Sequence, residues 1–434
     1  MEERWSTEHI LSLAPDAAAQ KAAGKLSSPA PWSQAGCGQG ALWGLCQGSG
    51  STPYRTVIEL TTPAYQCSCP SRKFPCKHAL GLLLLWSGSA EAVPAGREPA
   101  DWAAKWLTGR QQRAEKTAAP ADPLAARRRA ERRAAKVASG ARELRLRLAD
   151  RVRQGIAGAG GAAGGGWAEV SARMVDAQAP GLATRAAELD RLPADEQLAG
   201  YALLHLLATA YERVDELPEP LAQTVRARIG FSTDSAELLA GPTVRDHWLV
   251  LGSRDSADDP LTTRHLWLRG AKTGRSALLL SYGRPGQAPE LALPTGWSLE
   301  AELAFHPGVQ PLRAVLGPRH GPPALDPGAP WAQSIGAALA SYGEAVAEDP
   351  WTESWPVVLG GVLPSTSPTG WQLTDQQGAL PLHAIPDQAL WRLTAISGGR
   401  PVTVFGDCGH RGFTPVTVWD EQGRATSLTT GGAA

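Results

Sequence analysis

Three cysteines and a histidine lie within the twelve positions of CSCPSRKFPCKH, spaced as Cys67-x-Cys69, six residues, Cys76-x-His78. Alternate residues of a strand share a face, so Cys67 and Cys69 at the end of a hairpin can direct two thiolates to one point. A loop that enters a helix can bring Cys76 and His78 to the same point. Three thiolates and one imidazole form a closed, tetrahedral zinc site of the structural type. We therefore expect one structural Zn²⁺ ion.

The four ligands and their spacing resemble the SWIM-type zinc finger, in which Cys-x-Cys and Cys-x-His are separated by a variable gap. The wider context, with CQGSG upstream and CSCPSRKFPCKHALGLLLLW across the ligands, is similar to bacterial SWIM zinc finger proteins. This resemblance implies a β-hairpin followed by a helix, here over residues 54–88. It also implies a module that binds DNA or protein, and an association with MoxR-type AAA ATPases and von Willebrand factor A-domain proteins.

Other combinations of reactive residues are weaker. Cys408-Gly-His410 repeats the Cys-x-His spacing and could join Cys37 and Cys46, but the flanking glycines favour a hairpin loop. The stretch LRGAKTGRS, residues 268–276, has the wrong glycine spacing for a phosphate-binding loop and is better read as a tight turn. No G-x-S-x-G, H-E-x-x-H or dinucleotide signature is present. The sequence therefore offers no catalytic residues, and we expect a non-enzyme.

Charge is uneven along a chain whose formal net charge is zero. Residues 127–153 carry eleven basic and three acidic side chains, a net charge of +8. Such a block is either a solvated helix face or a surface for an acidic partner. The candidate partner-binding residues are Arg127, Arg128, Arg129, Arg132 and Arg133, together with Arg72, Lys73 and Lys77 beside the zinc ligands. For the last three, the favoured interpretation is that they offset the net −1 charge of three thiolates on Zn²⁺, and phosphate contact is the alternative.

Hydrophobic periodicity predicts a multidomain α+β protein. An N-terminal unit, 1–97, contains the finger; a basic helical segment with a glycine-rich linker, 98–166, and a second helical region, 167–241, follow. Residues 242–434 form short apolar runs separated by turn residues, which predicts a mainly antiparallel β domain. The sequence shows no internal repeat.

Three apolar groups are the expected helix cores. A first group should pack behind the zinc ligands: Leu80, Leu83 and Leu84. A second recurs every four residues beside the arginines: Leu144, Leu148, Val152 and Ile156. A third should mark a buried helix: Leu203, Leu204, Leu206 and Leu207.

The longest leucine run, residues 82–85, is far shorter than the ~18 apolar residues that suggest a membrane span. Six cysteines are too few for a disulfide framework in a 434-residue chain, and three of them accompany the histidine. We therefore expect a soluble cytoplasmic protein with no membrane partner.

The leading functional hypothesis is a zinc-binding adaptor that recognises a protein, and the resemblance implies a MoxR-type AAA ATPase as that partner. Nucleic-acid binding through the finger and the basic helix is the alternative. An enzyme with a site in the β-rich half ranks third.

Overall fold

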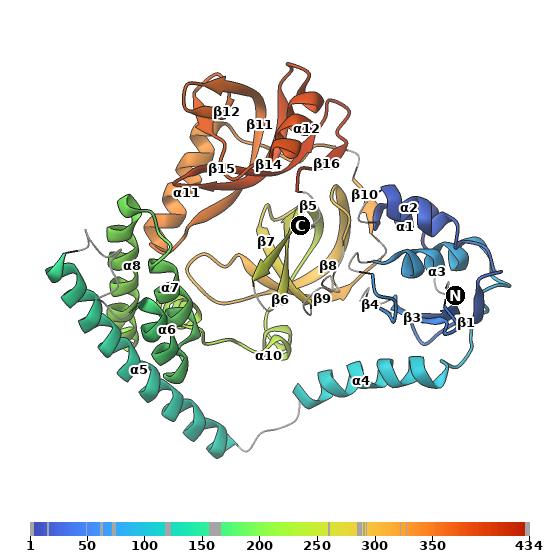
Figure 1. Cartoon of the computed structure of the whole chain (residues 1–434), viewed down its shortest axis with the longest axis horizontal. Helices are drawn as coiled ribbons and strands as arrows, with labels where there is room; N and C mark the ends of the chain where they lie inside the picture. The colour runs from blue at the N-terminus through green and yellow to red at the C-terminus, as the bar shows by residue number, and fades with distance from the viewer. Residues whose placement is uncertain are drawn as a thin grey trace.

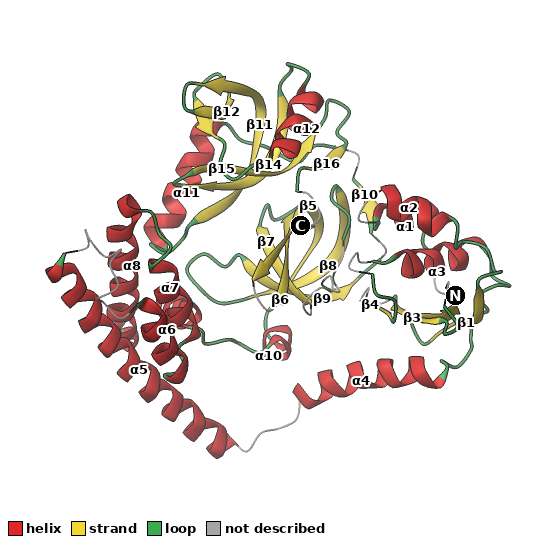
Figure 2. Cartoon of the chain, in the orientation of Figure 1, coloured by secondary structure: helices red, strands yellow, loops and turns green. Residues whose placement is uncertain are grey.

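The computed structural model describes the chain except for residues 1–3, 15–16, 49, 61–63, 72–74, 118–122, 156–165, 259–260, 284–288, 290, 292, 322, 327 and 430–434. Arg72, Lys73, Ile156 and most of the glycine-rich segment fall outside the described residues. The predicted α+β class is confirmed (Figure 2). None of the described helices combines the length and hydropathy that crossing a membrane requires.

A four-stranded antiparallel sheet, in the order β1-β2-β3-β4, organises the N-terminal unit. Its elements are α1 (Thr7–Ser12), α2 (Ala17–Gly24), β1 (Trp32–Gly38), β2 (Ala41–Cys46), β3 (Tyr54–Glu59), β4 (Ala64–Cys67) and α3 (Lys77–Gly88). Helix α3 packs with α1 and α2 on one face of the sheet, and nine consecutive residues from His78 to Trp86 are buried there. The expected burial of Leu80, Leu83 and Leu84 is confirmed.

The opposite face of this sheet is covered by α4 (Asp101–Thr117). Ala103 of α4 packs against Trp43 and Val57, and Arg110 donates a hydrogen bond of 3.0 Å to Glu59. The sheet that carries Cys67 is therefore held between helices on both faces.

A helical domain lies on the other side of the molecule (Figure 1). It consists of α5 (Pro123–Gln154), α6 (Trp167–Asp176), α7 (Pro180–Leu189), α8 (Ala194–Glu212), the 3₁₀ turn η1 (Val214–Glu216) and α9 (Glu219–Ile229), and α10 (Ser235–Ala240) leads out of it. Its core contains the expected Leu144 and Leu148. The stripe does not extend as predicted, since Val152 in the last turn of α5 is 44 % exposed.

The expected burial of the third leucine group is only half correct. Leu204 and Leu207 are buried in the helical core, but Leu203 and Leu206 on the outer side of α8 are exposed. A run of leucines around a helix supplies more apolar surface than one buried face can cover, so the run alone does not say which residues face solvent.

The strands from residue 244 to residue 319 close into a barrel. They are β5 (Val244–Asp258), β6 (Leu261–Gly270), β7 (Ser276–Gly283), β8 (Trp297–Phe305) and β9 (Arg313–Arg319), with the short β10 (Ala324–Leu325) added beside β8. Antiparallel pairing joins β5 to β6 and β6 to β7, and a parallel pairing joins β7 to β9. Strand β9 then pairs with β8, and β8 returns to β5. The closed order is β5-β6-β7-β9-β8.

The expected tight turn at residues 268–276 connects β6 and β7. The buried carboxylate of Asp246 accepts hydrogen bonds from the backbone N–H groups of Lys272 and Thr273, at 3.0 and 2.9 Å, and from the Thr273 hydroxyl at 2.7 Å. Gly274 takes a positive φ of 64° in this turn. The glycine-containing segment is therefore a hairpin turn stabilised by Asp246, and it is not a phosphate-binding loop.

The strands from residue 354 to residue 419 repeat the strand order of the first barrel. They are β11 (Ser354–Ser367), β12 (Gly370–Thr374), β13 (Ala379–Pro381), β14 (Val402–Gly409) and β15 (Gly412–Trp419), with β16 (Ala425–Ser427) beside β15. Leu382, directly after β13, forms a parallel bridge with Phe413 of β15. The order is β11-β12-β13-β15-β14, and α12 (Asp387–Ser397) lies between the third and fourth strands.

This second barrel is preceded by α11 (Ile335–Glu348). The two barrels are thus a topological repeat, although the sequence shows none. Strand order is set by pairings distant in sequence, which short apolar runs do not encode.

The two barrels pack directly on each other. Trp267 of the first barrel and Phe405 of the second meet edge to face at 5.8 Å, within a shared cluster of buried apolar residues. Gly252 of β5 is required by this contact, since a Cβ there would lie 2.7 Å from Val416. The β-rich half therefore forms one packed pair of barrels (Figure 1).

Trp351 joins the helical domain to the second barrel. It precedes β11, yet its ring is buried in the core of the helical domain, and its indole N–H donates to the carbonyl of Leu203 at 2.9 Å. An ion pair between Arg228 of α9 and Asp349 lies beside it. The helical domain is therefore anchored by a side chain from the C-terminal half.

Candidate metal centre

The hairpin of β3 and β4 brings the first two ligands into place. Thr56 and Cys67 are register partners, and the Thr56 hydroxyl lies 3.4 Å from the Cys67 Sγ. Strand β4 ends at Cys67, and Cys69 lies in the bend that follows, where the Ser68 N–H still donates to the Arg55 carbonyl at 3.0 Å. The chain leaves the sheet with both sulfurs near its edge.

The N-terminus of α3 supplies the other two ligands. Cys76 is the N-cap residue, and its Sγ accepts the N–H of Ala79 at 3.5 Å. His78 lies in the first turn, where its ring stacks against Tyr54 of β3 with centroids 4.8 Å apart. A helix N-terminus favours a thiolate, because its free N–H groups point toward the negative charge.

The four donor atoms have the separations that a tetrahedral zinc ion requires. Zn–S bonds of about 2.3 Å and Zn–N bonds of about 2.0 Å place sulfur and nitrogen about 3.5 Å apart at the tetrahedral angle. The Cys67 Sγ and His78 Nδ1 atoms are 3.7 Å apart, and all four ligand atoms lie within 4.8 Å of one another. Cys67, Cys69, Cys76 and His78 are thus positioned to bind one zinc ion.

Two of the ligand thiols have raised pKa values, which bears on how the cluster binds a metal. Without a metal, hydrogen bonding to Cys69 raises the pKa of the Cys67 thiol to about 11. The pKa of Cys76 is also raised, because Cys67 and Cys69 share its proton and because the thiol is buried. Cys67 and Cys76 must lose their protons to bind Zn²⁺ as thiolates, which links zinc binding to proton release.

All four coordination positions are supplied by the protein, so a zinc ion here has no open position for a substrate. Among the residues that the structure describes, this is the one group of three or more Cys, His, Asp or Glu side chains arranged to hold a metal. Cys408 instead lies near the end of β14 and His410 in the β14–β15 turn, as the hairpin interpretation predicted.

Two protein-family models match the chain, one at the metal centre and one at the helical domain. The SWIM zinc finger matches residues 54–86, and the SWIM-associated four-helix bundle domain matches residues 132–229. The chain contains a SWIM finger and its associated helical domain. No curated protein and no solved structure matches the chain. Both barrels lie outside the two matched ranges.

The SWIM finger also lies beside the first barrel. Tyr65 of β4 is buried, and its hydroxyl lies near enough to the Arg319 guanidinium of β9 that each group affects the pKa of the other. Burial is the larger effect and lowers the pKa of Arg319 to about 10. The strand that carries Cys67 therefore lies close to the first barrel (Figure 1).

Among the described residues, the predicted basic groups of the finger and of α5 are separate. Lys77 is exposed at the start of α3, whereas α5 lies away from the finger (Figure 1). Arg127 pairs with Glu131 at 2.9 Å, and Arg133 donates to the Gly230 carbonyl and stacks over Phe231. The remaining three predicted arginines of α5 are exposed: Arg128, Arg129 and Arg132.

Sequence reasoning did not identify the residues that support the ligands. Thr56 and Tyr54 contact Cys67 and His78 from β3. Their alternation on one strand was a usable signal, because residues i and i+2 share a face and the hairpin register sets Thr56 opposite Cys67. Tyr65 and Arg319 had no such signal, since their proximity joins distant parts of the chain.

Proposed function

We propose that the chain is a non-catalytic, zinc-stabilised interaction protein that recognises a protein partner. The closed ligand set supports a structural metal, and cysteines that form no disulfide suit a reducing compartment such as the cytoplasm. The SWIM finger then acts as a rigid element, docked on the first barrel, and the partner binds elsewhere on the assembly.

The observation that carries this proposal is an apolar groove beside α8. A groove of about 770 Å³ separates the helical domain from the second barrel. Leu189, Leu203 and Leu204 line its helical wall. Ion pairs of Arg411 with Glu196, and of Arg185 with Glu353, connect the two walls. The groove thus has an apolar wall and a charged rim, as protein-binding sites do.

The apolar surface continues outside the groove along α8. Leu198, Leu203 and Leu206 are 59 %, 37 % and 44 % exposed. These residues, with Ala199 and Ala202, place apolar side chains on the outer face of one helix. A contiguous exposed apolar surface of this kind is typical of a site where a partner helix or strand packs.

The resemblance to bacterial SWIM zinc finger proteins suggests the class of partner. A MoxR-type AAA ATPase, working with a von Willebrand factor A-domain protein, is the candidate that we propose. The chain would present a bound client or position the ATPase, and the α8 surface would be the point of contact.

Binding of the purified full-length chain to such an ATPase tests this. The double variant Leu203→Asp/Leu206→Asp should weaken binding by about 30-fold or more, since a central apolar contact is worth about 2 kcal/mol. The matched control is Leu146→Asp/Val175→Asp, which alters apolar residues on α5 and α6 that are more exposed than Leu203 and Leu206. Equal binding by both double variants, or no binding by the wild type, would refute the α8 assignment.

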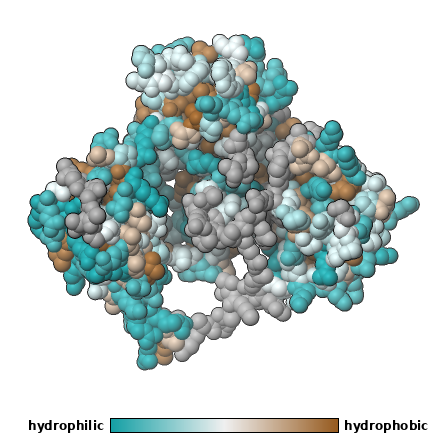
Figure 3. Space-filling view, viewed as in Figure 1, coloured by the Kyte–Doolittle hydropathy of each residue, from teal (hydrophilic) through white to brown (hydrophobic). Residues whose placement is uncertain are grey.

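Nucleic-acid binding through α5 and the finger is the second candidate, and one observation favours it. The first turns of α5 extend beyond the helical core, whose first residue on this helix is Val137, and their surface is mostly hydrophilic (Figure 3). Arg128, Arg129 and Arg132 are exposed on this extension. If the helix contacts five phosphates of a duplex, log affinity should fall with log salt with a slope of about −4.5.

Replacing the five arginines between positions 127 and 133 with Ala decides between these candidates. Submicromolar duplex binding that persists at physiological salt and is lost in this variant would make nucleic acid the leading ligand of α5. Retained ATPase binding by the same variant would support the α8 surface as the protein-binding site.

A further inference from the structure

Both barrels have the strand order of the OB-fold, a five-stranded Greek-key barrel. In each, the first strand pairs with the second and fourth, and the third strand runs parallel to the fifth. The second barrel also has a helix, α12, between its third and fourth strands. OB-folds bind oligonucleotides and oligosaccharides on the face of the second and third strands, beside the loop between the fourth and fifth.

A cleft occupies this position on the first barrel. Its volume is about 460 Å³. Arg269 of the second strand and Ser276 of the third are register partners, so their side chains share a face. Both line the cleft, as do Gln310 and Leu312 from the loop between the fourth and fifth strands.

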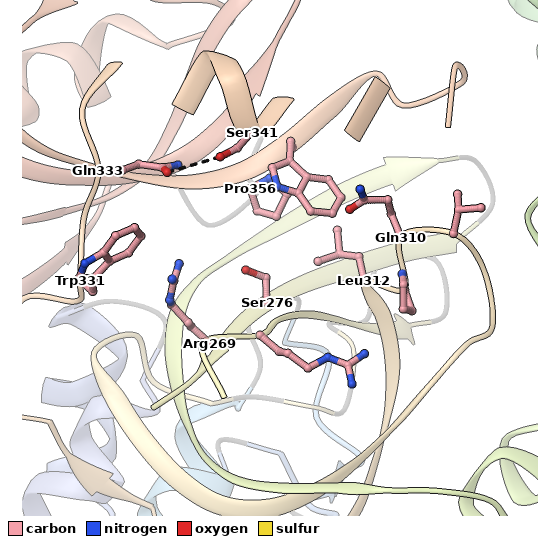
Figure 4. Close-up of a pocket in the computed structure, with 13 residues that line it drawn as sticks. Arg269, Ser276, Gln310, Leu312, Trp331, Gln333, Ser341 and Pro356 are labelled. Carbon is pink, nitrogen blue, oxygen red and sulfur yellow. Dashed lines mark hydrogen bonds between the residues drawn. The ribbon is translucent and has the colours of Figure 1, made fainter. Parts of the chain in front are cut away.

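The second barrel, together with the segment and helix that precede it, forms the other side of the cleft (Figure 4). Trp331 and Gln333 come from the segment before α11, and Pro356 begins the first strand of the second barrel. The Ser341 hydroxyl donates to the Gln333 amide oxygen at 3.5 Å. The site therefore lies between two OB-type barrels in tandem, and residues from both would contact one ligand.

The charge of the cleft favours an anionic ligand. Arg269 and Arg275 line it, and the described lining contains no Asp or Glu. Neither guanidinium has a carboxylate within ion-pair distance among the described residues. Each is instead stacked on an aromatic ring, Arg269 over Trp331 at 4.9 Å and Arg275 over Phe305 at 3.8 Å. Stacking holds the guanidinium plane and leaves its edge N–H groups able to donate to phosphate.

The side chain of Trp331 is positioned to stack on a nucleic-acid base. Trp331 is 66 % exposed at the rim of the cleft, although a tryptophan usually buries most of its ring. An exposed ring beside two arginines combines a stacking platform with a positive groove, which is how single strands are bound without sequence preference. A neutral oligosaccharide would use the ring but would leave both guanidinium groups without an anion.

We propose that the cleft between the barrels binds single-stranded nucleic acid, with Arg269 and Arg275 on phosphates and Trp331 stacked on a base. The proposal is independent of the α8 surface and of the α5 arginines. It assigns a ligand to the half of the chain that neither family model covers.

Fluorescence anisotropy of the zinc-loaded, full-length protein provides the test. The probes are labelled oligo-dT and oligo-rU of about 12 nucleotides, a length that OB-folds cover. We expect both to bind more tightly than a duplex of equal length, and the tighter of the two identifies DNA or RNA as the source. Trp331→Ala should weaken binding about 5- to 150-fold.

Matched variants separate stacking from charge. Trp391→Ala removes a ring that is 68 % exposed on α12, away from the cleft, and should bind like the wild type. Arg269→Ala/Arg275→Ala should reduce the salt slope of single-strand binding by about 1.4, because each phosphate contact contributes about 0.7. Arg213→Ala, at a solvent-exposed pair with Glu216, should leave the slope unchanged.

Four results would overturn the proposal. The first is no binding of either oligonucleotide, and the second is wild-type affinity in Trp331→Ala. The third is complete loss of binding when only the α5 arginines are replaced. The fourth is displacement of the oligonucleotide by a neutral glucose oligomer, which would make the cleft a sugar site. Zinc content and the thermal transition of each variant confirm that it is folded.

Discussion

Loss of zinc should release the SWIM finger from the rest of the molecule. The perturbation is Cys69→Ala, which removes one of four ligands but leaves the buried Cys76 and His78 in place. Structural zinc in small fingers binds with about 10 to 16 kcal/mol, which is comparable to the ~5 to 15 kcal/mol stability of a whole domain. The apolar core around α3 cannot replace a contribution of that size.

The effect should also extend beyond the finger. Tyr65 lies two residues before Cys67 and is buried beside Arg319 of β9. When the hairpin loosens, this proximity is lost, so amides in β3, β4, α3 and β9 should all lose protection from hydrogen exchange. Strands of the second barrel should keep their protection, because their buried core cluster contains no described residue of the finger.

Hydrogen exchange with mass spectrometry and elemental analysis together measure this. Cys46→Ala is the matched control, because Cys46 is a buried free cysteine of the same sheet outside the ligand group. It should retain one zinc per chain and wild-type exchange in β9. If Cys69→Ala keeps a full zinc equivalent and the same N-terminal protection, the assignment of the ligands is wrong.

Three further results are expected. Leu83→Ala should destabilise the N-terminal unit by about 2 to 5 kcal/mol in thermal melts, because the side chain is fully buried behind His78; an unchanged transition would contradict its place in the core. Trp351→Ala should cost about 3 to 5 kcal/mol and separate the melting of the helical domain from that of the barrels in calorimetry; a single unshifted transition would refute the anchor. Asp246→Asn should weaken the β6–β7 turn in denaturant titrations. Burial opposes ionisation of Asp246, but hydrogen bonds from Thr273 and neighbouring amides hold its pKa below the ordinary value. The stability that the ionised carboxylate contributes is therefore present above the unfolded pKa. In the wild type it should be lost as the pH falls below about 4 toward the lower folded pKa. A wild-type stability that does not change over this acidic range would count against it.

The metal ligands could be predicted from the sequence because the constraint on them is local. A tetrahedral site needs four donors at one point, and Cys67 to His78 form a short hairpin end and helix start that bring them together. Burial of Leu80 and Leu83 follows from the same locality, since a helix that begins at the metal must pack on the hairpin.

The features that could not be predicted depend on distant pairings. Apolar runs predicted strands in the C-terminal half, but closure depends on β9 meeting both β7 and β8. The exposure of Leu203 and Leu206 depends on what packs against α8. The burial of Trp351 depends on a domain that ends more than a hundred residues earlier in the chain. Periodicity identifies a face of an element but not its neighbour.

The proximity of Tyr65 to Arg319 has a consequence for synthesis on the ribosome. About 250 residues separate the two side chains in the chain. At about 5 to 20 residues per second, the finger emerges roughly 10 to 50 s before the strand that covers it. During that interval the nascent hairpin exposes its apolar edge without the barrel. Zinc closes the finger from residues that emerge together, so we expect metal binding to protect the growing chain from aggregation until β9 is made.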